Sequence, residues 1–168
     1  MNNLQMSIAG TIVDGVHMLP LRVYYEDTDA SGVVYHANYL RFIERGRTDL
    51  IRCLGINHVD LAEFHQLRFA VSRCELQYCS PAYLDDYLQV FTAVLRYGFA
   101  TVHVRQVVRR DDIDLFCAKV RLACVDKIGR PRRFPKVVQS IFASLSDCDL
   151  AGSVPSNFKF QHLREESA

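Results

Sequence analysis

Apolar and polar residues repeat with two different periods along this chain, and the change of period outlines its elements. Residues 21–26 alternate one by one, which predicts a strand. The next apolar stripe recurs every three or four residues, which predicts a helix with Asn38 as its N-cap and Gly55 just past its end. Gly46 lies on that stripe, where glycine costs about 1 kcal/mol against alanine. A glycine at this position indicates that a sheet approaches the helix closely.

The second half of the chain returns to the period of strands. Four strand-like runs are separated by short turns, and they cover residues 68–80, 86–97, 100–110 and 115–126. The run at 86–97 is apolar on both faces, which predicts a strand buried on both faces within the chain or at a subunit contact. Short connections between such runs predict an antiparallel sheet. A terminal helix is expected from Pro135 to about Leu145, because proline suits the first turn of a helix. The predicted class is α+β, with a long helix wrapped by a curled antiparallel sheet.

This pattern covers one domain, which we place at residues 20–146. Residues 1–19 are expected to be a weakly ordered leader without chemistry, with at most a short edge strand near residues 8–13. Residues 147–168 are expected to be a polar tail. The full length of 168 residues is sufficient for a sizeable core.

Composition excludes several classes of protein. The formal net charge is +1, so no strong overall field favours nucleic acid or an anionic membrane. No apolar run reaches the roughly 20 residues of a transmembrane helix, and the N-terminus lacks the pattern of a secretory signal. The cysteines form no CxxC pair, so we expect reduced, buried thiols in a cytoplasmic protein. Their positions are Cys53, Cys74, Cys79, Cys117, Cys124 and Cys148.

The stretch between the first strand and the long helix contains the candidate chemistry. Acidic and small residues fill positions 27–32, and a helix N-terminus follows within about ten residues. A carboxylate and free backbone N–H groups can therefore surround one carbonyl group. On the residues alone, however, an aspartate in a turn before a helix is more often a turn former or an N-cap.

Residues 24–39, which read YYEDTDASGVVYHANY, and residues 42–47, which read FIERGR, resemble the motif of the hotdog-fold acyl-CoA thioesterases. Within them the chain is most similar to the Tol-Pal-associated thioesterases, which are relatives of 4-hydroxybenzoyl-CoA thioesterase. The resemblance continues more loosely through residues 73–87 and 132–136. It therefore covers roughly residues 20–145.

This resemblance implies hydrolysis of an acyl-CoA thioester to a free acid and coenzyme A. It implies that Asp29 is the catalytic carboxylate, acting as a base on water or as a nucleophile. It gives Tyr25 and His36 supporting roles, with the backbone N–H at His36 polarising the thioester carbonyl. Ser31 stands where the family commonly has glycine, and its hydroxyl either shifts the loop or offers an additional hydrogen bond.

Several of these residues also have a purely structural interpretation. Tyr25 shares a predicted strand face with core residues, and His36 can simply begin the helix. We interpret Asp27 as a turn residue. Another hotdog branch carries its catalytic carboxylate on the long helix, but for Glu44 we expect an ion pair with neighbouring arginines on the helix surface.

A basic loop precedes the terminal helix. Its cations suit the phosphoryl groups of coenzyme A, although a solvated loop is the alternative; they are Arg130, Arg132, Arg133 and Lys136. We expect no separate cofactor, because coenzyme A is part of the substrate. We expect no metal either, because the acidic and histidine residues of the motif match no standard ligand spacing.

The resemblance further implies that two copies pair their sheets edge to edge, giving a homodimer or homotetramer with the site between subunits. Two other functions remain open. One is an acyl-thioester hydratase or dehydratase on the same fold. The other is a non-catalytic module that binds acyl carrier protein or an envelope complex, a role that can coexist with hydrolysis.

Overall fold

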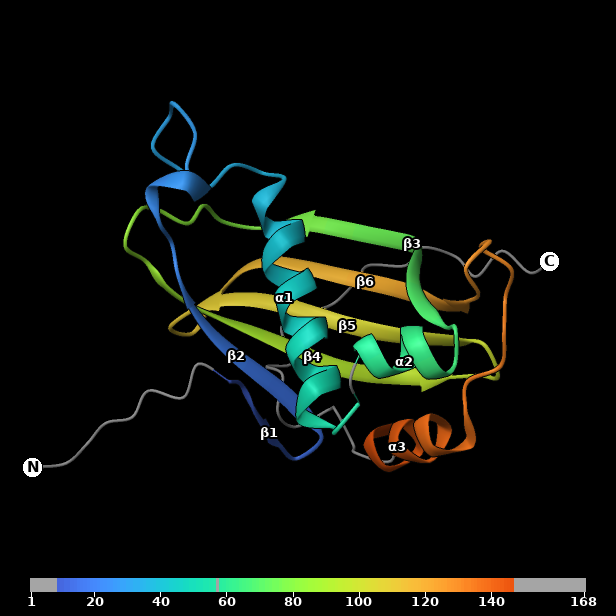
Figure 1. The fold of residues 1–168 in the computed structure, drawn as a ribbon. Coiled ribbons are helices and arrows are strands. Elements are labelled where there is room, and N and C mark those ends of the chain that lie inside the picture. Colours follow the sequence, from blue (N-terminus) through green and yellow to red (C-terminus); the bar gives the residue numbers. More distant parts are fainter. Residues whose placement is uncertain (1–8, 57, 147–168) are drawn as a thin grey trace, which may run out of the picture.

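The computed structural model describes residues 9–56 and 58–146, and its centre is an antiparallel sheet of six strands (Figure 1). The strand order across the sheet is β1-β2-β4-β5-β6-β3. The strands are β1 (Thr11–Val13), β2 (Val16–Arg22), β3 (Arg68–Tyr78), β4 (Tyr87–Tyr97), β5 (Thr101–Arg110) and β6 (Ile113–Val125). The predicted meander of β4, β5 and β6 is confirmed, and β3 forms one outer edge of the sheet.

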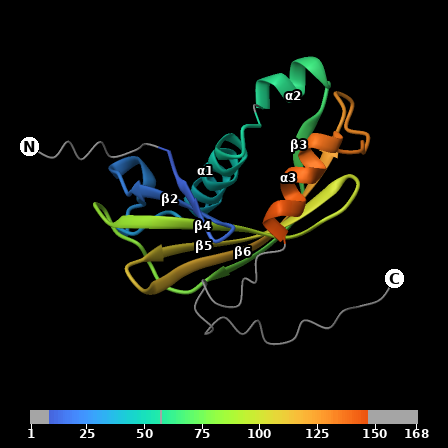
Figure 2. The same cartoon turned by 90° about the horizontal axis from the view of Figure 1, so that it is seen from below.

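The sheet curls around the long helix α1 (Asn38–Cys53), as the apolar pattern predicts (Figure 2). The buried face of α1 carries Phe42, Ile43 and Leu50, and it meets the side chains of β4, β5 and β6 in one apolar core. Burying large aliphatic and aromatic side chains contributes about 1.5–3 kcal/mol each. Two shorter helices complete the described chain, α2 (His58–Phe64) and α3 (Lys136–Ser146). The prediction of an α+β fold is confirmed.

Gly46 is the point of closest approach between α1 and the sheet. A Cβ atom there would lie 2.8 Å from Val90 Cγ1 and 3.1 Å from Thr92 Oγ1. The buried side chain of Gln106 crosses the same contact and donates from Nε2 to the Ile43 carbonyl oxygen at 2.8 Å. The close approach predicted from the sequence is therefore confirmed.

The predicted strand at residues 21–26 is wrong in its bounds. Strand β2 ends at Arg22, and Tyr25–Asp27 form a short 3-10 helix. The cause is Asp27, which is buried and whose carboxylate accepts a hydrogen bond from the Tyr24 N–H at 2.9 Å. Such a local side-chain bond closes a turn and competes with extended backbone. As a result, the side chain of Tyr25 is 82% exposed and does not lie on a core face.

Residues 9–19 do not behave as the predicted leader. Strand β1 falls within the edge strand allowed near residues 8–13, but β2 begins at Val16, and Val16, His17 and Leu19 are buried. Strand β2 pairs along its whole length with β4, from Val16 opposite Ala93 to Arg22 opposite Tyr87. Residues 1–8 and the predicted polar tail, 147–168, lie outside the described residues.

The predicted end of α1 at Gly55 is confirmed, but its predicted N-cap is wrong. Ala37 is the N-cap residue, and Asn38 is already helical, so the predicted cap at Asn38 is wrong. The Asn38 side chain instead donates to the Glu26 carbonyl oxygen at 3.4 Å. Gly55 follows the helix with a φ of +74°, the left-handed conformation that favours glycine after a helix.

The cysteines are only partly as predicted. The described cysteines are all free thiols, but Cys53, Cys74 and Cys79 are exposed, while Cys117 and Cys124 are buried. Burial raises the pKa of the Cys124 thiol to about 11. Cys148 lies outside the described residues. In the part of the chain that the structure describes, no helix is both long and apolar enough to cross a membrane.

Candidate active site

Asp29 is presented by a tight loop between β2 and α1. Thr28 and Val34 form an isolated antiparallel bridge, and the Asp29 N–H donates to the Val33 carbonyl at 2.9 Å. Gly32 donates back to the Asp29 carbonyl at 3.0 Å and has a φ of +80°, which side chains other than glycine rarely adopt. The loop therefore fixes the backbone of Asp29 and leaves its side chain half exposed.

The Asp29 carboxylate is held in its ionised form. Its Oδ1 atom accepts two hydrogen bonds from Ser31, one from the hydroxyl at 2.7 Å and one from the backbone N–H at 2.8 Å. These bonds, led by the one from the hydroxyl, lower the pKa of Asp29, and the nearby His36 lowers it further. Among the described residues Asp29 Oδ2 has no hydrogen-bond partner. One carboxylate oxygen is thus free to accept a proton.

The two residues just before α1, His36 and Ala37, supply unpaired backbone donors near this loop. The Tyr35 carbonyl accepts from the Asn38 N–H at 2.8 Å, which closes the turn that leads into α1. Within the described residues the N–H groups of His36 and Ala37 have no partner. Free N–H groups and the positive end of the helix dipole both stabilise a negatively charged oxygen. The arrangement is suited to binding a carbonyl oxygen that gains charge.

The structure brings together two of the three predicted catalytic residues. His36 is exposed, lies close enough to Asp29 to affect its pKa, and contacts the Tyr35 ring in a tilted arrangement with ring centroids 4.4 Å apart. Tyr25 points into solvent, and in the described chain no hydrogen bond or ring contact joins its ring to Asp29 or His36.

Tyr78 is a contact of this site that the sequence did not reveal. Its hydroxyl donates to the His36 carbonyl oxygen at 3.0 Å. It extends from the end of β3, and no sequence pattern links it to a residue 42 positions earlier.

The basic loop lies at the other end of the sheet (Figure 1). Arg132 is paired with Asp126 at 3.1 Å, and the Arg133 guanidinium lies 4.5 Å from the centroid of the Phe99 ring. Both arginines line a cleft of about 600 Å³ between this loop and the end of α2. The remaining lining residues are Phe64, His65, Gln66, Leu67, Asp126, Lys127 and Ile128. Arg130 and Lys136 are exposed but do not line the cleft.

Strand β3 separates this cleft from Asp29. It runs from Arg68, opposite Val125, to Tyr78, opposite Phe116. Eleven residues of strand span roughly 33 Å at about 3.3 Å per residue. Within one chain, Asp29 and the basic loop are therefore at opposite ends.

Glu44 does not form the predicted surface ion pair. Its carboxylate accepts a hydrogen bond from the Thr48 hydroxyl at 2.7 Å, one helical turn later. In the described chain no arginine or lysine nitrogen lies within ion-pair distance of it.

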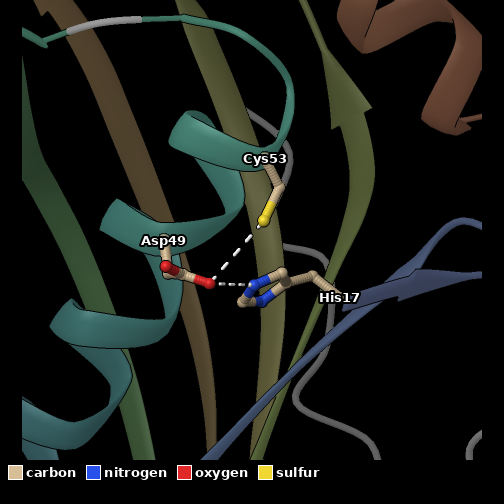
Figure 3. Close-up of side chains that lie close together, drawn as sticks. All are labelled: His17, Asp49 and Cys53. Carbon is tan, nitrogen blue, oxygen red and sulfur yellow. Dashed lines mark hydrogen bonds and ion pairs between the residues drawn. The ribbon is translucent and has the colours of Figure 1, made fainter. Parts of the chain in front are cut away.

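A second polar cluster joins β2 to α1 (Figure 3). The buried His17 lies 2.9 Å from Asp49 Oδ2, and the same oxygen accepts from the Gly10 N–H at 2.7 Å. The Cys53 thiol lies 3.7 Å from it. Burial lowers the pKa of His17.

The ligand-type atoms of this cluster lie within 4.8 Å of one another. However, a Cβ at Gly10 would lie 2.4 Å from His17 Nε2, so the backbone at Gly10 already fills the adjacent space. We interpret the cluster as a structural link between strand and helix.

A curled antiparallel sheet around one long helix, with a carboxylate loop before the helix, defines the class of hotdog-fold thioesterases. The chain belongs to the thioesterase superfamily, whose family model matches residues 31–117.

Named relatives narrow this assignment. The chain is 45% identical over 136 residues to acyl-CoA thioesterase YbgC of Haemophilus influenzae, covering 80% of this chain and 99% of that protein. It is 38% identical over 125 residues to acyl-CoA thioester hydrolase YbgC of Escherichia coli O157:H7, covering 73% of this chain and 92% of that one. The crystal structure of a probable thioesterase from Bartonella henselae superposes with a TM-score of 0.69 at 39% identity, covering 71% and 99% of the two chains.

Proposed function

We propose that this chain hydrolyses acyl-CoA thioesters to a free carboxylic acid and coenzyme A. The observation that carries the proposal is the ionised Asp29 carboxylate near the free N–H groups of His36 and Ala37, just before α1. The names of the YbgC relatives support the same activity.

In the hydrolysis step, Asp29 Oδ2 takes a proton from a water molecule as the water oxygen attacks the thioester carbonyl. The carbonyl oxygen becomes an oxyanion, which the His36 N–H binds. When the intermediate collapses, the carbon–sulfur bond breaks and coenzyme A leaves as a thiolate. A thiol has a pKa of about 8.5, so this leaving group needs little help from an acid.

The same carboxylate serves an alternative route, in which Asp29 attacks the carbonyl carbon directly. This route forms a mixed anhydride with the acyl group and releases the thiolate, and water then hydrolyses the anhydride. A single turnover in ¹⁸O-labelled water distinguishes the two. Only the anhydride route, with water attacking the aspartyl carbonyl, leaves label in Asp29.

We propose that the functional unit is a homodimer in which β3 pairs with β3 of a second copy, or a homotetramer made of two such dimers. The free edge of β3 is exposed along its length, including Val71 at 54%, Leu76 at 39% and Tyr78 at 48%. An exposed strand edge with apolar side chains is a ready surface for pairing with another chain.

Antiparallel pairing of two β3 strands brings opposite ends together, so each basic loop lies beside the partner's Asp29 loop. The phosphoryl groups of coenzyme A then meet Arg130, Arg132, Arg133 and Lys136 of one subunit while the thioester meets Asp29 of the other. In such a dimer, the partner subunit offers a surface that the exposed Tyr25 side chain can contact. His36 helps to keep the Asp29 carboxylate ionised, because it lowers the pKa of Asp29.

The motif over residues 24–47 supports a place among the Tol-Pal-associated thioesterases, and the free thiols of the described cysteines support a cytoplasmic location. An acyl group carried on acyl carrier protein offers the same thioester chemistry, and it is therefore a second substrate form to test.

The test is turnover of acyl-CoAs of short to long chain length, followed by detection of the free thiol. Asp29→Asn removes the base but keeps the size of the side chain, and we expect a loss of about 10²–10⁴-fold in kcat. Asp112→Asn, in the exposed turn before β6, is the matched control and should retain full activity.

Unchanged activity in Asp29→Asn contradicts the site. Enoyl product without thiol release favours a hydratase or dehydratase, and tight binding of acyl carrier protein with no hydrolysis favours a binding module.

A further inference from the structure

The carbonyl group of His36 is held by a side chain and not by the backbone of α1. The Tyr78 hydroxyl, at the end of β3, donates to this carbonyl oxygen at 3.0 Å. The backbone of α1 bypasses the same oxygen, because the Leu40 N–H donates to the Ala37 carbonyl at 3.2 Å. Among the described residues no second hydrogen-bond donor reaches the His36 carbonyl. The direction of this carbonyl therefore depends on one hydroxyl.

The same bond also sets the direction of a backbone N–H. The peptide unit between His36 and Ala37 is trans and planar, so the His36 carbonyl and the Ala37 N–H point in opposite directions. Ala37 is the N-cap residue of α1, and its N–H has no partner in the part of the chain that the structure describes. Because Tyr78 holds the carbonyl, the Ala37 N–H is held pointing away from the Tyr78 hydroxyl.

The Tyr78 ring is packed firmly enough to act as this anchor. It contacts the Phe116 ring nearly edge-on with ring centroids 5.0 Å apart, and the Tyr39 ring at 5.8 Å. Burial, with a smaller effect of the nearby Cys74, raises the pKa of Tyr78, so the hydroxyl stays protonated at neutral pH and remains a donor. A tyrosine hydroxyl has one hydrogen, and here that hydrogen is used by the His36 carbonyl.

We propose that Tyr78 is a positioning residue, whose hydroxyl orients the peptide unit between His36 and Ala37 so that the Ala37 N–H is a second donor to the oxyanion. This role rests on the proposed function and adds a donor beside the His36 N–H. Tyr78 itself does not contact the reacting carbonyl. An N–H that is already oriented needs no reorganisation when the oxyanion forms, and such donors therefore accelerate the chemical step.

The first variant is Tyr78→Phe, which removes the hydroxyl and keeps the ring contacts. The substrate is the acyl-CoA of the chain-length panel that the unmodified chain hydrolyses fastest. We expect kcat to fall about 10–100-fold while KM stays within about threefold, because the oxyanion forms only after the substrate has bound. The acidic limb of the pH–rate profile, which reports Asp29, should stay in place. Tyr87→Phe, a similarly exposed tyrosine of β4 (46% against 48% for Tyr78), is the matched control and should retain full activity.

The second variant, Ala37→Pro, removes the N–H itself. Ala37 has a φ of −71°, which proline adopts, and proline is tolerated at the start of a helix. We expect kcat to fall at least as far as in Tyr78→Phe. In the double variant, loss of the Tyr78 hydroxyl should lower kcat by less than a further factor of about two, because the hydroxyl acts through an N–H that is already missing.

The thioester carbonyl gives a readout that does not depend on turnover. Chains with Asp29→Asn are mixed with the same acyl-CoA carrying ¹³C at the carbonyl carbon, and the infrared stretching frequency of the bound carbonyl is measured. Hydrogen-bond donors aimed at the carbonyl oxygen polarise the C=O bond and lower this frequency. In Asp29→Asn/Tyr78→Phe we expect a frequency between that of Asp29→Asn and that of the free substrate.

The outcomes separate this role from the proposed function. No thiol release by the unmodified chain contradicts the proposed function, and the role of Tyr78 with it. If the unmodified chain is active, an unchanged kcat in Tyr78→Phe or an unchanged carbonyl frequency overturns the role of Tyr78 alone. An acidic limb that moves overturns it too, since the loss then arises at Asp29. So does a fully multiplicative loss in the double variant, since the hydroxyl then acts by a route other than the Ala37 N–H.

Discussion

The Asp29 carboxylate depends on one neighbour, Ser31, whose hydroxyl and backbone N–H both donate to the same oxygen. Both bonds stabilise the charged form, and the hydroxyl has the larger effect on the pKa. The hydroxyl therefore keeps Asp29 ionised to lower pH, at the cost of making it a weaker base.

Replacing Ser31 with glycine removes the hydroxyl bond and keeps the backbone bond. The pKa of Asp29 should rise, so the acidic limb of the kcat/KM profile, where activity falls as Asp29 becomes protonated, should move to higher pH. Ser31→Thr retains a hydroxyl and should keep the limb where it is. The check is a pH–rate profile together with an NMR titration of the Asp29 carboxyl carbon. An acidic limb that stays in place or moves to lower pH in Ser31→Gly contradicts the role of the hydroxyl.

The residues of the site that are close in sequence could be predicted, and the distant ones could not. Asp29 and His36 are seven positions apart within one loop and helix start, so their proximity follows from local geometry. Tyr78 reaches His36 only because β3 pairs with β6 in a particular register. A single sequence has no signal for that register.

At the scale of elements, periodicity predicted α1 and the strands β4, β5 and β6 well, since each is long and buries one face or stripe. It allowed an edge strand near residues 8–13, where β1 forms, but it missed β2, because β2 is stabilised by β4, about 70 residues later in the chain. It also extended a strand through Tyr25, because alternation does not reveal that the Asp27 carboxylate closes a turn.

The contact at Gly46 gives a direct test of how α1 sits on the sheet. Alanine there gains about 1 kcal/mol in helix propensity but brings its Cβ to 2.8 Å from the β-branched Val90. Overpacking a core costs about 1–3 kcal/mol, so we expect a net loss of about 1 kcal/mol in the free energy of unfolding.

Urea denaturation measures this loss. The control is Gly98→Ala, where the nearest atom, Thr101 Oγ1, lies at an ordinary 3.5 Å and the change should stay within about 0.5 kcal/mol. A Gly46→Ala variant that is more stable than the unmodified chain would show that the helix can move away from the sheet without cost.

At the scale of the whole molecule, the Asp29 carboxylate and the basic loop lie at opposite ends of β3. The two ends of this strand are roughly 33 Å apart. A substrate that contacts both must bridge two chains or extend along the full strand. Pairing of two β3 edges resolves this, because antiparallel strands place one chain's Asp29 next to the other chain's Arg132 and Arg133. The separation within one chain is thus an argument for a site shared between subunits.

Mixing two defective variants, with activity measured at substrate concentrations well below KM, tests this shared site. One chain carries Asp29→Asn and the other carries Arg132→Glu/Arg133→Glu, which should raise KM for coenzyme A thioesters by at least about tenfold. In a mixed dimer with shared sites, one site combines the intact Asp29 of the Arg132→Glu/Arg133→Glu chain with the intact arginines of the Asp29→Asn chain. The other site carries both defects. Activity should therefore rise on mixing to about half that of the unmodified dimer per mixed dimer, since one of two sites is restored.

If each site instead lies within one chain, every site in the mixture keeps one defect, and mixing restores nothing. The control is to mix either variant with itself after the same dissociation and reassociation, which should leave activity low in both models. Size-exclusion chromatography with light scattering confirms that the mixed species is a dimer. Because restoration requires the two ends of β3 to come from different chains, its appearance would establish both the pairing of the strands and the roles of Asp29 and the basic loop.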